Sequence, residues 1–155
     1  MVEVEVDDPF ATDVRLLLDE HLVEMRATSP ACSVHALEPE QLGEDGMTLL
    51  TAREGGVLLG CGALKDLGNG EGEIKSMRTT AQARGTGVAS GLLERLIQLA
   101  RDRGYSALRL ETGVEDHFVP ARALYVKYGF EPCGPFAEYT DDPNSVYYEL
   151  TLDNV

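Results

Sequence analysis

Residues 77–89, MRTTAQARGTGVA, connect a predicted β-strand directly to the best-defined amphipathic helix of the chain. Two glycines, Gly85 and Gly87, stand at the turn where this helix is expected to begin. A helix N-terminus exposes backbone N–H groups and the positive end of the helix dipole, and both favour an anion. Glycine also lets phosphate oxygens approach the backbone closely. The junction predicts a phosphate-bearing ligand, with a tight packing turn as the alternative interpretation.

Two common phosphate-binding loops do not fit this stretch. A P-loop requires Lys followed by Ser or Thr after its second glycine, but Val88 and Ala89 stand there. A dinucleotide-binding fingerprint of the form GxGxxG requires glycine at position 90, which is Ser90. The loop therefore indicates a phosphate ligand without assigning its class.

Hydrophobic periodicity on both sides of the loop predicts a mixed α/β sheet with helices on its faces, in a single domain covering residues 1–155. His21 falls on the apolar face of the first helix, which favours a packed, hydrogen-bonded histidine over a catalytic one. The expected strands are residues 2–6, 48–53, 57–64, 73–79, 108–112 and 145–152, and the expected helices are 12–27, 39–42, 85–103 and 121–128.

Composition limits the class of protein. Asp and Glu outnumber Lys and Arg by 27 to 13, for a formal charge of −14, which argues against nucleic-acid binding and mildly favours a cationic substrate. A merely solubilising acidic surface is the alternative. No apolar run approaches the ~20 residues that cross a bilayer, and the N-terminus is acidic, so we expect a cytoplasmic protein without membrane contact. Three scattered cysteines and three histidines predict neither a disulfide framework nor a metal site.

Two motifs together resemble the GNAT superfamily of N-acetyltransferases. Residues 84–89, RGTGVA, match the pyrophosphate-binding pattern (Q/R)xxGx(G/A), and residues 121–130, ARALYVKYGF, match AxxLYxxxGF. They stand in the order and at the separation typical of that superfamily. The resemblance implies a single-domain GNAT fold, with a mixed, mostly antiparallel twisted sheet flanked by helices on both faces. It also implies acetyl-CoA as co-substrate.

Further segments resemble a bacterial subfamily of indole-acetate-type acetyltransferases. The resemblance implies an acetyltransferase that acts on a small-molecule acceptor, an amine, by direct attack in a ternary complex. Dimers are common in the superfamily, so a homodimer is one of the oligomeric states that stay open. Two alternatives stay open, a non-catalytic acyl-CoA-binding sensor and a structural module. The shared segments are SP at 29–30, SVHAL at 33–37, GCGALK at 60–65, EIKSMRT at 73–79, LETG at 110–113, CGPF at 133–136 and DPNS at 142–145.

The resemblance implies two contact regions for acetyl-CoA. The pantetheine arm would run beside Met77, Arg78 and Thr79, whose N–H groups would also polarise the thioester carbonyl. Many superfamily members contact the arm with an Asn three residues before the alanine of AxxLYxxxGF, but Phe118 stands there. Backbone N–H groups would hold the pyrophosphate at Arg84, Gly85, Thr86, Gly87, Val88 and Ala89.

Acetyl transfer also needs an acid and a base. Tyr125 matches the tyrosine that usually protonates the CoA sulfur, with core packing as the alternative. Glu73 and Glu111 are equally reasonable candidates for the base, and His35 is a third.

Residues Ser33, His35 and Lys75 are candidates for contact with the acceptor. Strict strand alternation would put Lys75 on the same face as Glu73 and Met77, and Arg78 on the other. Lys75 would then pair with a carboxylate of the chain or bind an acidic acceptor.

Overall fold

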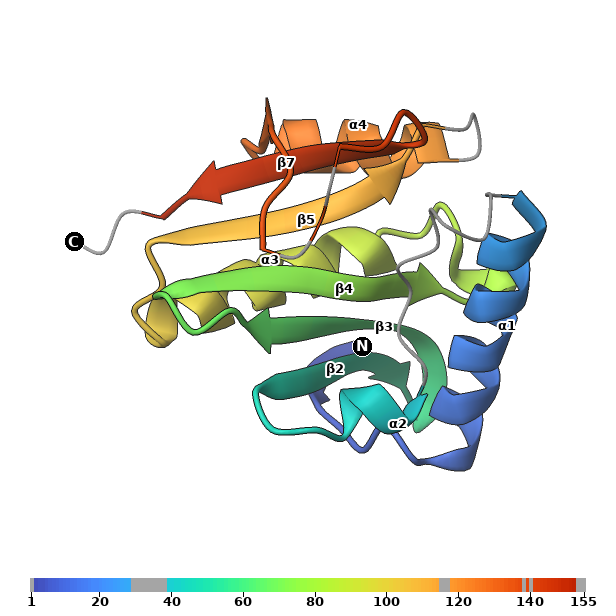
Figure 1. The fold of residues 1–155 in the computed structure, drawn as a ribbon. Coiled ribbons are helices and arrows are strands. Elements are labelled where there is room, and N and C mark those ends of the chain that lie inside the picture. Colours follow the sequence, from blue (N-terminus) through green and yellow to red (C-terminus); the bar gives the residue numbers. More distant parts are fainter. Residues whose placement is uncertain (1, 29–38, 115–117, 138, 140, 153–155) are drawn as a thin grey trace.

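The computed structural model describes residues 2–28, 39–114, 118–137, 139 and 141–152, which form an α/β domain around one seven-stranded sheet (Figure 1). The strand order is β1-β2-β3-β4-β5-β7-β6, and all neighbours pair antiparallel except β4 and β5. The strands are β1 (Glu3–Val6), β2 (Met47–Glu54), β3 (Val57–Asp66), β4 (Glu71–Thr79), β5 (Ala107–Gly113), β6 (Glu131–Cys133) and β7 (Ser145–Thr151). The helices are α1 (Thr12–Thr28), α2 (Pro39–Leu42), the 3-10 turn η2 (Ala81–Ala83), α3 (Val88–Asp102) and α4 (Val119–Lys127).

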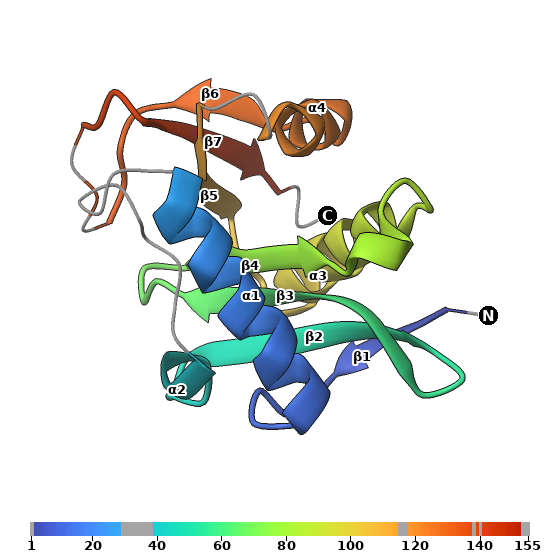
Figure 2. The ribbon, with the colours of Figure 1, turned by 90° about the vertical axis from the view of Figure 1, so that its right-hand side faces the viewer.

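Helices cover both faces of the sheet (Figure 2). On one face, Val14, Leu17 and Leu18 of α1 pack with Leu42 of α2 against β2 and β3. On the other face, the apolar stripe of α3 forms the larger core together with Tyr125 of α4. The mixed, mostly antiparallel sheet with helices on both faces, expected from the sequence, is confirmed.

The sequence-based boundaries differ from the structure at two elements. The helix expected over residues 85–103 begins only at Val88, because Gly85 and Gly87 take left-handed φ values of 75° and 88°. The edge strand β6 was not expected, since it has only three residues and Pro132 is one of them. The other expected strands and helices all form, with ends shifted by at most two residues.

A bulge at Ser76 interrupts β4. The pairing register between β3 and β4 shifts between Cys61 and Ala63, opposite Ser76, whose φ is 55°. Such an extra residue reverses the alternation of side chains beyond it.

The bulge changes which side chains share a face of β4. Lys75 pairs with Ala63 and Arg78 pairs with Cys61, and both partners belong to the core beneath α1. Met77 lies on the opposite face, which α3 covers. A Cβ built on Gly62 would lie 2.6 Å from Met77 Sδ and 3.0 Å from Cδ1 of Leu96 in α3. The strict alternation expected from the sequence is therefore wrong, because Lys75 and Arg78 face the same side and Met77 does not.

Strands β4 and β5 separate after a short parallel stretch. They pair only from Glu71 opposite Ala107 to Ile74 opposite Leu110, while both strands continue further (Figure 1). Beyond Ile74 the sheet is open between them.

Candidate active site

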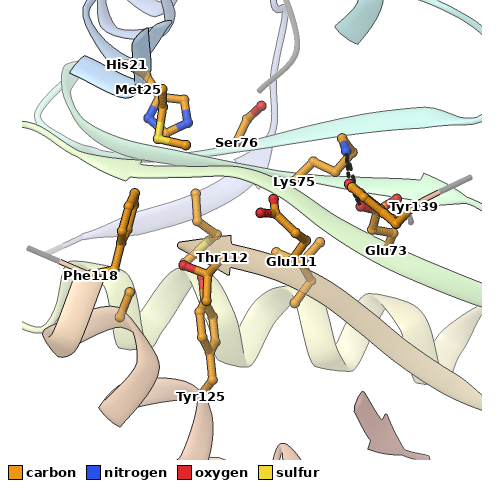
Figure 3. A pocket seen from close by; sticks show the side chains of 13 residues that line it. His21, Met25, Glu73, Lys75, Ser76, Glu111, Thr112, Phe118, Tyr125 and Tyr139 are labelled. Atoms are coloured by element: carbon orange, nitrogen blue, oxygen red, sulfur yellow. Dashed lines mark hydrogen bonds and ion pairs between the residues drawn. The ribbon is translucent and has the colours of Figure 1, made fainter. Parts of the chain in front are cut away.

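A cavity of about 100 Å³ lies where β4 and β5 separate (Figure 3). Helix α1 forms one wall and the start of α4 forms another. The lining residues are His21 and Met25 of α1, residues 73–77 of β4, Glu111 and Thr112 of β5, and Phe118, Ala121, Tyr125 and Tyr139. Five of the expected site residues thus line one cavity, although the first and the last are 52 positions apart in the sequence: Glu73, Lys75, Met77, Glu111 and Tyr125.

The glycine-rich loop lies just beyond the cavity, at the start of α3. Gly87 is the N-cap of this helix and provides no side-chain hydrogen bond to it. A Cβ added to Gly85 or Gly87 would meet no heavy atom within 4 Å, so neither glycine is needed for close packing. Neither glycine is therefore there to avoid a clash with a neighbouring residue. Both glycines serve the left-handed backbone, which leaves the uncapped start of α3 available to an anion.

Two arginines join this loop and the end of β4 to α1. Arg78 Nη1 forms an ion pair with Glu24 Oε2, and Arg84 Nη2 lies 3.7 Å from Glu24 Oε1. The Arg78 side chain is largely buried, whereas that of Arg84 is exposed. The two contacts position α1 against the strand end that borders the cavity.

Three buried polar atoms near the end of β4 have no hydrogen-bond partner among the described residues: Ser76 Oγ, Arg78 Nε and Thr80 Oγ1. Buried polar groups in folded proteins are normally hydrogen-bonded. Ser76 is only 8% exposed and lines the cavity. The Ser76 hydroxyl is therefore available to hydrogen-bond a polar ligand in the cavity.

Glu73, Lys75 and Tyr139 form a closed cluster at one end of the cavity (Figure 3). Lys75 Nζ donates to Glu73 Oε2 over 3.1 Å and to the Tyr139 hydroxyl over 2.7 Å. The Tyr139 hydroxyl in turn donates to Glu73 Oε2. Glu73 is 2% exposed, and the Lys75 side chain is 8% exposed. Of the two roles expected for Lys75, the pairing with a carboxylate of the chain is the one observed.

Glu111 lies between that cluster and Tyr125 (Figure 3). Its Oε2 accepts a hydrogen bond of 2.8 Å from Ser145 Oγ. Its negative charge contributes to raising the pKa values of Tyr125, Tyr139 and Tyr147, after the larger effect of burial on each. Glu111 therefore acts electrostatically on tyrosines on both sides of it in the cavity.

Tyr125 is both a core residue and a cavity residue. Its ring contacts those of Phe130 and Tyr148, with centroids 5.8 and 6.4 Å away. Burial, followed by the charge of Glu111, raises the pKa of its phenol to about 12. At neutral pH the phenol is therefore protonated, as a proton donor at this place must be.

His21 was not expected at the site, and the structure lines the cavity with it. Burial, followed by the positive charge of Arg78, lowers the pKa of the imidazole to about 4, although Glu24 opposes this shift. His21 is therefore neutral at pH 7. The sequence held one signal for this position. His21 stands four residues before Met25, so both side chains lie on the same face of α1, and both line the cavity.

The remaining expected site residues fall into two groups. Ser33 and His35 lie outside the described residues. Arg78, Thr79 and residues 84–89 do not line the cavity but follow it directly, at the end of β4, in the turn before α3 and in the first two residues of α3. Phe118 stands at the N-cap of α4 and lines the cavity, in place of the Asn that the superfamily pattern would have there.

Comparison with known proteins assigns the fold and its motifs to one family. Residues 14–130 match the model of the Acetyltransferase (GNAT) family. The chain belongs to the GNAT family. This GNAT protein is 47% identical over 151 residues to YsnE of Bacillus subtilis (strain 168), an uncharacterized N-acetyltransferase, and the match covers 97% of the chain and 100% of YsnE. It is 38% identical over 152 residues to the IAA acetyltransferase of Azospirillum brasilense, with coverage of 97% and 98%.

Solved structures agree with this assignment. A Klebsiella pneumoniae protein described as an acyl-CoA N-acyltransferase superposes with a TM-score of 0.80 at 31% identity, over 99% of each chain. An acetyltransferase of Bacillus subtilis, solved in complex with CoA, shares the fold with a TM-score of 0.73 at 16% identity, over 98% of this chain and 99% of that one. The GNAT protein is therefore an acyltransferase enzyme, and its family membership supports acetyl transfer. Among the described residues, no helix is long and apolar enough to span a membrane.

Proposed function

We propose that this GNAT enzyme transfers the acetyl group of acetyl-CoA to a small-molecule amine, which attacks the thioester directly within a ternary complex. The observation that carries the proposal is the cavity between β4 and β5. A carboxylate, Glu111, and a buried neutral phenol, Tyr125, line it together. Direct acetyl transfer to an amine needs a base and an acid at one place, and these two residues supply them.

The open edge of β4 fits the arm of acetyl-CoA. Within the described residues, β4 has no strand partner on its β5 side beyond Ile74. An extended amide-containing chain can pair with such an edge through backbone hydrogen bonds. We therefore assign Met77, Arg78 and Thr79 to the pantetheine arm and to polarisation of the thioester carbonyl. The unsatisfied Ser76 hydroxyl beside this edge supports a polar ligand here.

The start of α3 fits the pyrophosphate. Residues 84–89 include the uncapped helix N-terminus and the two left-handed glycines. Backbone N–H groups and the helix dipole there favour phosphate oxygens. When bound, acetyl-CoA supplies an activated acetyl thioester. The residues of the chain then have to orient the amine and move two protons.

The first proton leaves the amine. A free ammonium has a pKa near ~10 and must be deprotonated before the nitrogen can attack. We assign this step to Glu111, because it occupies the middle of the cavity beside Tyr125 and Ser145 holds its carboxylate. Glu73, already hydrogen-bonded by Lys75 and Tyr139, supplies negative charge at the acceptor end. Ser33 and His35 stay candidates for further acceptor contacts.

The second proton goes to the CoA sulfur. Tyr125 holds it on the phenol oxygen, and the raised pKa of about 12 keeps this oxygen protonated until a strong base such as a thiolate forms beside it. The phenolate that remains regains a proton from the amine nitrogen, which must lose its second proton after the attack, so the products are the amide, the free thiol and the proton taken up by Glu111. The burial of Tyr125 in the core beneath α4 fixes its direction, so packing and catalysis use the same contacts.

Neither cysteine of the described residues is suited to carry the acetyl group during the reaction, which is consistent with direct attack. Of the two cysteines in the described part of the chain, neither lines the cavity. Burial raises the pKa of Cys61 to about 12 and also raises that of Cys133, so neither thiol forms a reactive thiolate readily at neutral pH.

The test is an initial-rate measurement of CoA thiol release, with acetyl-CoA and the acceptor varied together. The acceptor panel contains primary amines, alcohols and carboxylic acids, including indole-3-acetate. We expect release with amines and intersecting double-reciprocal lines, which a ternary complex produces. Parallel lines would contradict direct attack, and release only with alcohols or acids would contradict the amine acceptor. Acetyl-CoA binding without thiol release from any acceptor would favour the sensor.

Two glutamine variants separate the carboxylates. Glu111→Gln should lower kcat by about a hundredfold or more, because it removes the base and keeps the shape. Glu73→Gln should mainly raise KM for the amine. A larger loss of kcat in Glu73→Gln than in Glu111→Gln would reverse the assignment.

A further inference from the structure

We infer that Tyr139 is a positioning residue that, together with Lys75, fixes the Glu73 carboxylate at the acceptor end of the cavity. This role rests on the proposed function, in which Glu73 supplies negative charge to the amine. Tyr139 lies outside both sequence motifs and reaches the site from the segment between β6 and β7, 66 residues after Glu73.

The hydrogen bonds of the cluster fix the position of the Glu73 carboxylate. This oxygen accepts from two donors, Lys75 Nζ and the Tyr139 hydroxyl, and Lys75 also donates to Tyr139. Each of the three groups therefore contacts the other two. A hydroxyl lost from this cycle removes a donor to Glu73 and an acceptor for Lys75 at once.

Aromatic packing holds Tyr139 in place independently of its hydroxyl. Its ring lies 5.0 Å from that of Phe136 and 5.7 Å from that of Tyr147, measured between centroids. Lys75 Nζ is 5.3 Å from the centre of the same ring. A Tyr139→Phe variant keeps these ring contacts, so it isolates the effect of the hydroxyl.

The positive charge of Lys75 is balanced by the Glu73 carboxylate of the chain and not by a ligand. Its ammonium is almost fully buried, and burial of a charge is tolerated when it is paired and hydrogen-bonded. Glu73 and Tyr139 provide that pairing. Lys75 therefore acts through Glu73 in the same cluster and does not serve as the main site for an acceptor carboxylate.

The test is a double-mutant cycle between Tyr139→Phe and Glu73→Gln, with Tyr147→Phe as the matched control. In the otherwise unchanged enzyme, Tyr139→Phe should raise KM for the amine about tenfold. It should leave kcat within about threefold and KM for acetyl-CoA unchanged, because the cluster contacts the acceptor side alone. In the Glu73→Gln background, the same substitution should change the amine KM by less than about threefold.

Equal effects in both backgrounds would overturn the role, since a residue that merely packs acts independently of Glu73. Tyr147→Phe removes a hydroxyl from the same aromatic group and should leave the amine KM unchanged. If the unchanged enzyme acetylates no amine, the proposed function itself fails. That outcome can be distinguished from equal effects of Tyr139→Phe in both backgrounds, which can be observed only in an active enzyme.

A second measurement needs no turnover. Tyr139 faces the charged or titratable groups Glu73, Lys75, Glu111 and Tyr147, and burial followed by the Glu73 carboxylate raises the pKa of its phenol. In NMR spectra of isotope-labelled tyrosines, assigned with Tyr139→Phe, the Tyr139 signal should titrate at a lower pH in Glu73→Gln than in the unchanged protein, because the variant removes one of the causes that raise its pKa and keeps its burial. The same titration in both proteins would overturn the contact on which the role depends.

Discussion

The Glu111 carboxylate and the Tyr125 phenol are electrostatically coupled across one cavity. Burial and then the negative charge of Glu111 raise the pKa of Tyr125 to about 12. The two residues come from β5 and α4, which border the opening between β4 and β5. The phenol stays protonated at neutral pH, so Tyr125 can donate one proton while the carboxylate beside it accepts another in the same reaction.

Removal of the Tyr125 hydroxyl should affect chemistry and not binding. We expect Tyr125→Phe to lower kcat by about a hundredfold or more, because the leaving thiolate loses its proton donor. The affinity for acetyl-CoA, measured by calorimetry, should stay within about threefold. Tyr148→Phe is the control, since Tyr148 contacts the Tyr125 ring but does not line the cavity. An unchanged kcat in Tyr125→Phe would rule out this acid.

Replacement of Gly87, at the start of α3, should weaken acetyl-CoA binding in addition to straining the backbone. Gly87 and Gly55 both have positive φ, 88° and 57°, and neither has a neighbour that a Cβ would meet. Alanine at either position should therefore destabilise the fold by a similar ~1–2 kcal/mol. Only Gly87→Ala should also weaken acetyl-CoA binding, by about tenfold, because Gly55 lies in the β2–β3 turn. Equal affinities in the two variants would contradict the phosphate site.

Two glycines, one packed beneath α3 and one on the open side of α3, should respond to alanine with opposite signs. A Cβ on Gly60 would lie 2.9 Å from the backbone oxygen of Arg78 and 3.1 Å from Leu92 Cδ1. Gly60→Ala should therefore destabilise the protein by about 1–3 kcal/mol. Gly91, in α3, would meet nothing within 4 Å, so Gly91→Ala should stabilise by up to about 1 kcal/mol. Urea unfolding of both variants measures the difference, and a stabilised Gly60→Ala would contradict the packing described.

The neutral state of His21 should make stability depend on pH. Burial lowers the pKa of His21 in the folded protein to about 4, whereas the unfolded value is about 6.5. Between these values the unfolded chain binds a proton that the folded protein does not, so stability falls as the pH drops from about 6.5 to about 4.

Comparison with His21→Gln isolates this contribution from that of the many carboxylates. From pH 7 to about pH 4.5, the unchanged protein should lose about 2–3 kcal/mol more unfolding free energy than the variant. Urea unfolding at the two pH values measures both losses. Equal losses would show that the pKa of His21 is the same in the folded and the unfolded protein.

The sequence predicted the regular elements and the glycine loop because both leave local patterns. Helix α3 and the strands around it follow from periodicity, and Gly85 and Gly87 mark the turn directly. The bulge at Ser76 leaves no such pattern, since one extra residue in an alternating strand cannot be distinguished from continued alternation. The faces of Lys75, Met77 and Arg78 were consequently assigned incorrectly.

The candidate site was predicted in part for a related reason. Tyr125, Glu73 and Glu111 stand in or beside motifs, and all three line the cavity. Tyr139 reaches Glu73 from a loop between two strands, 66 residues further along the chain, so no local sequence pattern predicts the contact. His21 was interpreted as a core residue because the apolar face of α1 continues past the core and into the cavity wall.

The most direct test of the central claim follows the acetyl group itself. The enzyme is incubated with acetyl-CoA carrying an isotope-labelled acetyl group and a panel of primary amines, and the products are identified by mass spectrometry and NMR. We predict labelled N-acetylated amine formed in equal amount with free CoA thiol, and almost none with Tyr125→Phe. Acetyl-CoA that binds but leaves every amine unlabelled, or label that appears on the protein instead, would contradict direct acetyl transfer in this cavity.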